Sequence, residues 1–277
     1  MTRIALFGAG GKMGLRCARN LVASDFDVDY VEIAPEGIAR LREIGVEPTD
    51  GGVAARRADA AILAVPDSAM GAVASLVVPL LPSGSFVMIL DPAGPHGGTI
   101  PDRSDVGVFV SHPCHPPVVN DETDPDAKRD FYGGIKAKQS IVCALFRGDE
   151  SVYTRGEAVA RAIFAPVMRS HRITVEQMAI LEPAMAETVT LTLMYTIREA
   201  MDEAIRAGVP EDAARDFMLG HINVNIGILF GYLGIEVSDG AKRAVERGRA
   251  MILKENWRDV FRPQNVMAEV RAIVDPR

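Results

Sequence analysis

The chain has 277 residues, which is enough for one large domain or two smaller ones. Apolar residues make up 48% and charged residues 24%, a mix that is ordinary for globular proteins and excludes disordered and fibrous classes. The net charge is −7 and no basic run occurs, so nucleic acid is not expected as a partner.

The cysteines and the apolar runs indicate where in the cell the protein is expected to be. Cys17, Cys114 and Cys143 are an odd number at no zinc-binding spacing, which favours a reducing environment without a disulfide framework. The apolar start of the chain breaks into glycines and reads as a strand instead of a signal peptide. The segment 222–235 is too short to span a bilayer. We therefore predict a cytoplasmic protein without a membrane partner.

The first half of the chain alternates short apolar runs with segments whose apolar residues recur at helical spacing. The expected strands are Arg3–Phe7, Asp29–Ile33, Ala60–Val65, Phe86–Asp91 and Val106–Ser111. The expected helices between them are Lys12–Ala23, Gly37–Glu43 and Ser68–Leu81. Strands that alternate with crossover helices predict a parallel sheet covered on both faces.

The pattern then changes twice. Residues 116–135 are polar and rich in Asp, Pro and Gly, so they are expected to form a loop. Strands return at Gln139–Phe146 and Pro166–Ile173, with a helix at Gly156–Ala165 between them. The α/β pattern ends near residue 173.

From residue 174 the chain is expected to be all helical. Thr174 and Gln177 fit a capping box, in which the two side chains satisfy free N–H groups at a helix start. The helix is expected to reach Arg206, and a second one begins at Pro210 and continues into the apolar segment 217–234. The fold class is therefore α/β, with a Rossmann-type parallel-sheet domain over residues 1–173 followed by an all-helical domain over residues 174–277.

A glycine-rich turn follows the first strand. Only glycine lets a backbone approach a pyrophosphate closely, and the next helix N-terminus supplies N–H donors. The spacing departs from the usual dinucleotide fingerprint, because the last glycine is Gly14 and position 13 is Met13. The alternative is a turn that binds nothing. The residues predicted to bind the cofactor here are Gly8, Ala9, Gly10, Gly11, Lys12, Met13 and Gly14.

Two later strand ends extend the predicted cofactor site. Glu32 is placed to accept hydrogen bonds from ribose hydroxyls, which favours NAD over NADP, although Lys12 and Arg16 offer charges that a 2′-phosphate would need. A strand-end turn is expected to lie against the nicotinamide half, unless its proline simply ends the strand. That turn consists of Val65, Pro66 and Asp67.

Two histidines stand in a proline-rich turn at the end of the fifth strand. His112 and His115 are separated by Pro113 and Cys114, and two further prolines follow. The carboxyl edge of a parallel sheet is where ligands bind. Rigidly placed imidazoles there suit a metal ligand or a general acid/base, and the alternative is a purely structural role.

Two acidic residues occupy the apolar helix after residue 174. Glu182 and Glu187 are flanked by apolar residues almost all round, so the helix is expected to be buried. A buried carboxylate requires compensation, which a divalent cation or a histidine would supply. The alternative partners are Arg169, Arg172 and Lys138.

The next helix carries the remaining candidates. His221 and Asn225 lie four residues apart on one face and are candidates for closing a substrate pocket, although a structural histidine explains the pattern equally. Ile222–Leu233 is too apolar for a solvated surface. We therefore predict a homodimer in which this segment is buried.

These motifs together resemble a family. The runs GAGGKMG, ILAVPD, HPCHPP and NDETDP, with the helical second half, are similar to D-apionate oxidoisomerases within the β-hydroxyacid and 6-phosphogluconate dehydrogenase superfamily. The resemblance covers almost the whole chain, and HPCHPP with NDETDP is its most specific part.

The resemblance implies an NAD-dependent oxidation of a branched 2-hydroxy sugar acid such as D-apionate, coupled to a 1,2-carbon shift. It further implies assistance by a divalent metal ion, with Zn, Mn, Mg and Ca all open. The predicted metal ligands are His115 and Glu182, with His112 and Glu187 in reserve. The predicted catalytic residues are His112, His115 and Glu187.

One departure from the superfamily bears on the choice between this metal-assisted oxidoisomerase, which is the first hypothesis, and two alternatives. Its dehydrogenases usually carry a catalytic lysine on the first long C-terminal helix, and Val175–Arg198 contains none. The second hypothesis is a metal-independent NAD(P)-dependent hydroxyacid dehydrogenase of the 6-phosphogluconate or 3-hydroxyisobutyrate type, with His115 as acid/base. The third is a protein that senses NAD without turnover.

Overall fold

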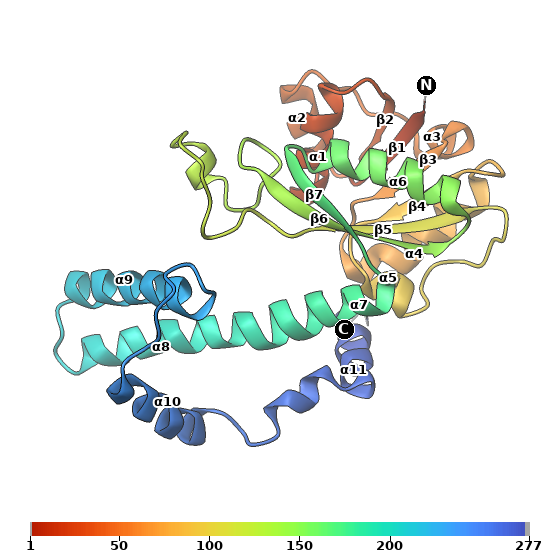
Figure 1. The fold of residues 1–277 in the computed structure, drawn as a ribbon. Helices are drawn as coiled ribbons and strands as arrows, with labels where there is room; N and C mark the ends of the chain where they lie inside the picture. The colour runs from red at the N-terminus through yellow and green to blue at the C-terminus, as the bar shows by residue number, and fades with distance from the viewer. Residues whose placement is uncertain (1, 275–277) are drawn as a thin grey trace. The chain divides into compact units, whose positions relative to one another are not determined.

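A seven-stranded sheet dominates the first part of the computed structural model, which describes residues 2–274 (Figure 1). The strand order is β2-β1-β3-β4-β5-β6-β7. All neighbours are parallel except β5 and β6, which are antiparallel. The mostly parallel sheet confirms the predicted fold class. The strands are β1 (Arg3–Phe7), β2 (Asp27–Val31), β3 (Ala60–Leu63), β4 (Phe86–Ile89), β5 (Gly107–Pro113), β6 (Gln139–Arg147) and β7 (Val167–Arg172).

Each face of the sheet has its own hydrophobic core, because successive side chains of a strand point to opposite faces. In β1, Ile4 and Leu6 belong to the core that includes residues of α1 (Lys12–Val22) and α6 (Glu150–Ile163). Ala5 and Phe7 belong to the opposite core. That second core includes residues of α3 (Gly51–Arg57), α4 (Asp67–Val77) and the short 3₁₀ helix η1 (Val78–Leu80).

Several short helices were not expected from apolar spacing. α3 consists of Gly, Val, Ala and Arg and has no apolar period. It is capped by Asp50, whose side chain accepts a hydrogen bond from the N–H of Val53 at 2.9 Å. α5 (Ala93–His96) is a single turn. The remaining elements of this part are α2 (Pro35–Glu43) and the 3₁₀ turn η2 (Ala127–Arg129).

The long helix after residue 174 has an irregular middle. Its first part is α7 (Val175–Ala179), and the predicted capping box of Thr174 and Gln177 is confirmed by hydrogen bonds of 3.0 and 3.2 Å. A π-helix, η3 (Ile180–Leu191), follows and contains Pro183. Proline removes one backbone donor, which is a physical reason for a change in hydrogen-bond pattern here. The helix then continues as α8 (Thr192–Arg206).

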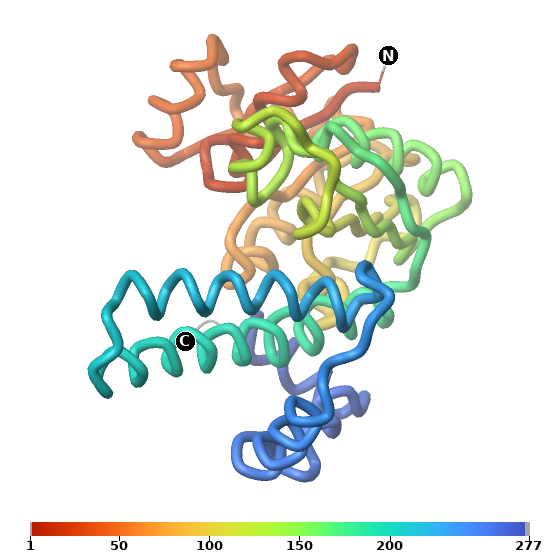
Figure 2. The backbone as a smooth tube through the Cα atoms, turned by 60° about the vertical axis from the view of Figure 1, so that its left-hand side comes forward, coloured from red at the N-terminus to blue at the C-terminus, as the bar shows by residue number. Residues whose placement is uncertain are grey.

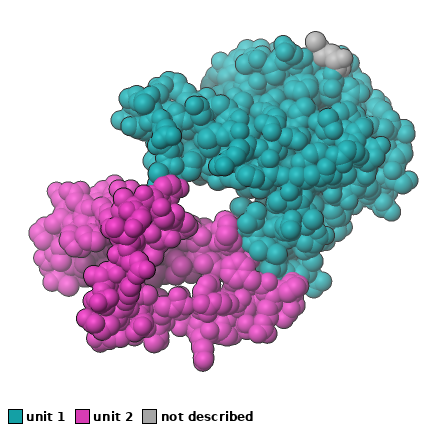
Figure 3. Space-filling model, viewed as in Figure 1, with its two compact units in different colours: residues 1–183, 266–277 teal, residues 184–265 magenta. Residues whose placement is uncertain are grey.

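The chain forms two compact units, coloured separately in Figure 3. One comprises residues 1–183 and 266–277, and the other comprises residues 184–265. In the second unit, α8 and α9 (Glu211–Leu229) lie side by side, as Figure 2 shows. The other helices of the C-terminal part are α10 (Asp239–Ile252), η4 (Trp257–Phe261) and α11 (Pro263–Val274). No helix among residues 2–274 has the length and apolar character needed to cross a membrane.

The long helix is less buried than its sequence predicts. Met185, Leu191 and Met194 are all exposed in the single chain, and so is Glu187. The prediction of a helix buried all round is therefore wrong for one copy of the chain. Apolar spacing reports which faces avoid water, but it does not say whether the same chain covers them.

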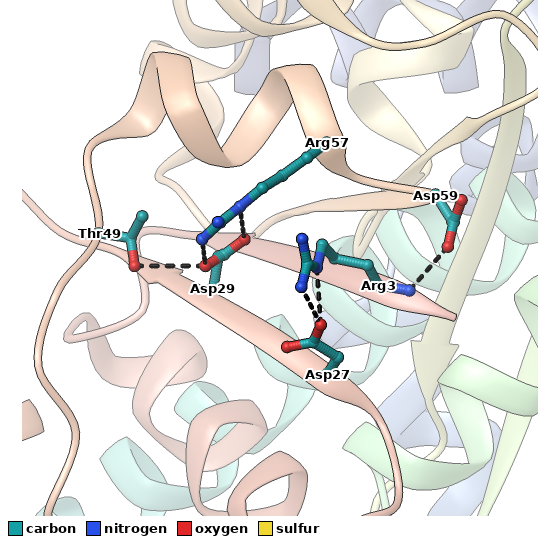
Figure 4. Close-up of polar contacts among 6 residues, drawn as sticks. All are labelled: Arg3, Asp27, Asp29, Thr49, Arg57 and Asp59. Carbon is teal, nitrogen blue, oxygen red and sulfur yellow. Dashed lines mark hydrogen bonds and ion pairs between the residues drawn. The ribbon is translucent and has the colours of Figure 1, made fainter. Parts of the chain in front are cut away.

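An ion pair between the buried Asp29 and the partly exposed Arg57 ties the edge strand β2 to α3. Asp29 is 6% exposed and accepts a hydrogen bond from Arg57 Nε at 2.8 Å. Thr49 Oγ1 also donates to this carboxylate at 3.4 Å, and Figure 4 shows the three side chains converging. At the start of the neighbouring strand, Arg3 pairs with Asp27 through Nε at 2.7 Å. Charged residues on an edge strand also discourage pairing with a second sheet.

We expect Asp29→Asn to lower the free energy of unfolding by about 1–2 kcal/mol, because a buried charge-assisted hydrogen bond is weakened. Urea denaturation of the variant measures this difference. The matched control is Glu47→Gln, since Glu47 pairs with Arg42 on the surface at 3.2 Å and should contribute almost nothing. Equal effects of the two substitutions would contradict a special role for the buried carboxylate of Asp29.

Candidate functional site

The glycine turn between β1 and α1 is closely packed. Gly8 has a φ of 72°, and a Cβ there would lie 2.5 Å from the carbonyl oxygen of Ala64. A Cβ on Gly10 would collide with the backbone of Gly37, and one on Gly14 with the carbonyl of Gly8. Ala9 donates its N–H to Val31 O at 3.1 Å. The turn therefore brings α1 close to the sheet and leaves room beside its N-terminus.

Glu32 holds this turn together from the end of β2. Its Oε2 accepts the N–H of Gly10 at 2.9 Å, and Oε1 accepts those of Ile33 and Ala34 at 2.8 and 2.9 Å. Arg40 donates from Nε to Gly10 O at 2.8 Å. Glu32, which was predicted to bind the ribose hydroxyls, therefore also fixes the shape of the glycine turn. Arg40 contacts the same turn and was not predicted as a site residue.

Two adjoining pockets run along the carboxyl edge of the sheet. The first has a volume of about 510 Å³ and is lined mainly by apolar residues together with Gly8, Glu32 and Arg40. The second has a volume of about 330 Å³ and includes Asp67 and His112. Both pockets share the lining residues Gly11, Ala64, Val65 and Pro66. Lys12 and Met13 line the second pocket, whereas Ala9, Gly10 and Gly14 line neither of the two and build the turn instead.

His112 is held in one orientation at the end of β5. Its Nδ1 lies 2.8 Å from the carbonyl oxygen of Leu90. Because a carbonyl oxygen only accepts, Nδ1 carries the proton in this contact. The other ring nitrogen, Nε2, lies 3.4 Å from Oε2 of Glu182. In the neutral ring that nitrogen is an acceptor, and it faces the carboxylate oxygen of Glu182.

The carboxylates near His112 are affected by burial. The pKa of Asp91 is raised mainly by burial, although the N–H of Ala93, at 2.7 Å from Oδ1, and His112 act in the opposite direction. Burial is also the largest cause of the raised pKa of Asp67, followed by the charge of Asp91. The second pocket is therefore a place where added negative charge is disfavoured.

His115 belongs to the same turn but has different partners. Its backbone φ of 61° is uncommon for a residue with a side chain. Its Nδ1 donates to the carbonyl of Tyr132 at 2.9 Å, which leaves Nε2 as an acceptor in the neutral ring. The ring centres of His115 and His112 are 6.1 Å apart. The structure brings the two histidines together, and it is His112 that contacts Glu182.

The two predicted acids lie in the same π-helix but in different compact units. Glu182 belongs to the first unit and is partly buried, at 25% side-chain exposure. Glu187 belongs to the second unit, so its catalytic role stays a prediction. π-helical segments often occur at functional sites, and this one carries the acid that faces His112.

His221, in α9, donates from Nδ1 to the carbonyl oxygen of Phe217 at 2.8 Å, and its ring stacks on the ring of Phe217.

The polar residues behind the histidine turn stabilise the loop. Asn120 donates to Pro117 O at 2.8 Å and accepts the N–H of Glu122 at 3.0 Å. Glu122 in turn accepts the N–H of Lys138 at 2.9 Å. These contacts give the loop its shape.

Among residues 2–274, no group of three or more His, Cys, Asp or Glu side chains is arranged to hold a metal ion.

The sheet, the glycine turn and the adjoining pockets define a dinucleotide-binding oxidoreductase fold. Residues 120–274 match the family described as phosphogluconate dehydrogenase (decarboxylating) C-term. D-apionate oxidoisomerase from Rhizobium rhizogenes (strain K84 / ATCC BAA-868) is 50% identical over 276 residues, covering 99% of this chain and all of that protein. D-apionate oxidoisomerase from Cupriavidus necator (strain N-1) is 48% identical and covers 98% of this chain and 99% of that protein.

A solved structure has the same fold over its whole length. It is a semialdehyde dehydrogenase NAD-binding protein from Cupriavidus necator in complex with calcium and NAD. Its TM-score is 0.96 at 47% identity, and the match covers 99% of both chains. The chain belongs to the D-apionate oxidoisomerase family. The predicted family and the predicted oxidoreductase class are thereby confirmed.

We expect Gly10→Ala to lower stability by about 1–3 kcal/mol, because its Cβ has no room against the Gly37 backbone. Gly11→Ala is the matched control, since its nearest neighbour would be Gly8 O at 3.2 Å and its φ of −70° suits alanine. Thermal unfolding of both variants checks the expectation. A Gly10 variant as stable as the Gly11 variant would show that the turn yields easily.

Proposed function

We propose that this protein is an NAD-dependent oxidoisomerase that oxidises a branched 2-hydroxy sugar acid and moves a carbon group between adjacent carbons, with D-apionate as the first candidate. The observation that carries the proposal is the pair of His112 Nε2 and Glu182 Oε2, 3.4 Å apart, with His112 lining the second pocket. The names of the relatives supply the substrate class. The proposal also retains a cytoplasmic location, since Cys17, Cys114 and Cys143 are all free.

The two pockets fit the two halves of NAD. Gly8 and Gly11 leave space at the N-terminus of α1, where N–H groups favour a pyrophosphate. Glu32 lines the first pocket and would oppose the charge of a 2′-phosphate, which favours NAD over NADP. Bound NAD would accept the hydride from C2 of the substrate. The related structure from Cupriavidus necator contains NAD, which supports the same cofactor here.

Proton transfer is assigned to the histidine turn. Oxidation of the C2 alcohol releases a hydroxyl proton together with the hydride, and His115 Nε2 is an acceptor because Nδ1 is occupied by the carbonyl of Tyr132. The product is a 2-oxo acid beside a tertiary alcohol at C3. In the second step the C3 hydroxyl loses its proton and becomes a ketone. The migrating group leaves C3 with its electron pair for C2, whose oxygen takes a proton.

His112 and Glu182 fit a divalent cation. Two ligand atoms at about 2.0–2.5 Å from one ion lie roughly 3–3.5 Å apart at right angles or slightly wider, and the observed separation is 3.4 Å. The Nδ1 contact with Leu90 O orients the imidazole, as is usual for metal-binding histidines. A cation there would polarise the 2-oxo group for the carbon shift. The structure thus favours His112 as the partner of Glu182, where the sequence favoured His115.

The same pair also supports a second function. If the proton lies between the two atoms, Glu182 stabilises an imidazolium and His112 acts as the acid/base of a metal-independent hydroxyacid dehydrogenase. The two functions differ in their need for a metal ion, and chelation separates them.

We expect the purified protein to form NADH from D-apionate, to lose this activity on chelation and to regain it with a divalent cation. His112→Ala and Glu182→Gln should each lower kcat/KM by about a hundredfold or more while NAD affinity changes little. His171→Ala, on the exposed face of β7, is the matched control and should behave as wild type. Turnover that ignores chelation would favour the dehydrogenase, and tight NAD binding without turnover of any sugar acid would favour a sensor.

We also propose that a second copy covers the apolar surface of the helical unit. Leu229 and Phe230, at the end of α9, are 72% and 75% exposed, and Tyr232, Leu233 and Ile235 beside them are exposed as well. Monomers rarely present so much contiguous apolar surface to water. A symmetric pair would bury the same patch twice.

Light scattering after size exclusion should therefore give twice the mass of one chain. Leu229→Asp combined with Phe230→Asp should shift the protein to monomer, because each buried side chain of this size contributes about 2 kcal/mol per copy. Leu76→Asp, which changes an exposed leucine in the sheet unit, should leave the mass unchanged. A monomeric wild-type protein would refute the dimer.

A further inference from the structure

Tyr132 joins the first turn of α1 to the histidine turn. Its hydroxyl oxygen accepts a hydrogen bond from Lys12 Nζ at 3.0 Å. Its carbonyl accepts one from His115 Nδ1 at 2.9 Å. The guanidinium of Arg16 lies over the tyrosine ring, 4.2 Å from its centre. One residue of the loop between β5 and β6 thus contacts both sides of the site.

The two cations stand where helix electrostatics disfavours them. Lys12 is the first residue of α1, at the positive end of the helix dipole, and Arg16 follows one turn later with the same charge. The phenol oxygen and the ring face of Tyr132 offset this cost through a hydrogen bond and a cation–π contact. The hydrogen bond and charge of Lys12, and then the charge of Arg16, lower the pKa of Tyr132.

Lys12 also lines the second pocket, beside Asp67, Asp91 and His112. Among the described residues that line this pocket, it is the only Lys or Arg. Asp67 and Asp91 line the same pocket, so an anionic substrate would meet two carboxyl side chains there. An anionic substrate that enters it needs a fixed positive partner.

The contact with Tyr132 directs the lysine toward the histidine turn. The N-terminus of α1 already offers backbone N–H groups to a pyrophosphate, so the cofactor does not require this ammonium. A free lysine side chain samples many rotamers, and the hydrogen bond to the phenol reduces that freedom before substrate arrives. The ammonium is therefore available, and oriented, for a second anion.

We propose that Lys12 receives the carboxylate of the substrate in the pocket beside His112, and that Tyr132 is the positioning residue that holds Lys12 there. The inference rests on the proposed function, which makes the substrate a sugar acid. It assigns Lys12 a role in substrate recognition, in place of the role in cofactor binding that the sequence predicted.

The test separates substrate from cofactor. Lys12→Gln should raise the KM for D-apionate by about 10–100-fold, the usual effect of losing a charge-assisted hydrogen bond, and change kcat by less than about threefold. The Kd for NAD, measured by fluorescence titration, should change by less than about threefold. Tyr132→Phe should raise the same KM by about 3–10-fold, and Lys12→Arg should restore part of the loss.

Two controls make the result specific. Lys136→Gln removes a lysine of the same loop, whose ammonium contacts Asp124 and Asp126 at 3.1 and 2.9 Å, and it should leave both constants unchanged. The uncharged amide of D-apionic acid, used as an inhibitor, should bind wild type and Lys12→Gln equally. A KM for D-apionate that stays unchanged in Lys12→Gln, or a Kd for NAD that rises as much as this KM, would overturn the inference.

Calorimetry with D-apionate in the presence of NAD separates this inference from the proposed function. A wild-type protein that binds the sugar acid without oxidising it would defeat the proposed function alone. In that case a weakened sugar-acid Kd in Lys12→Gln still supports the inference, and an unchanged one overturns it. A wild-type protein that binds no sugar acid overturns both.

Discussion

The close approach of α1 to the end of β1 is the constraint on which the site depends. Gly14 has no room for a side chain against the carbonyl of Gly8, and Gly10 has none against Gly37. This approach places the N-terminus of α1 at the carboxyl edge of the sheet, between two pockets that share Gly11. A dinucleotide pocket of this kind needs both the short distance and the unobstructed N–H groups.

A second constraint concerns protons. His112 donates from Nδ1 to a backbone carbonyl, and its other nitrogen faces a carboxylate at 3.4 Å. Two acceptors this close repel one another, so a positive charge between them would stabilise the pair. The π-helix that carries Glu182 gives this side chain its place, and it begins three residues before Pro183. The irregular part of the long helix therefore carries Glu182, the residue that faces His112.

Much of the fold was predictable because its elements depend on local patterns. β1 is predicted residue for residue, and the capping box at Thr174 is confirmed. Strand ends elsewhere differ by a few residues, as at β2, because the pairing partner decides where a strand stops. The antiparallel direction of β6 relative to β5 was not predicted. Apolar periodicity indicates that a segment is a buried strand, but it does not indicate the direction of the strand beside it. α3 was missed because its helix depends on a cap and not on an apolar stripe.

The sequence by itself determined the glycine turn, the order of the first five strands, and the presence of two histidines at a sheet edge. These follow from backbone sterics and apolar period, which act over a few residues. Only the tertiary structure decided that Glu182 contacts His112, that Tyr132 holds Lys12, and that the helical unit leaves its apolar face exposed. Those contacts join residues 70 and 120 positions apart, so no local pattern encodes them, and each depends on the packing of separate elements.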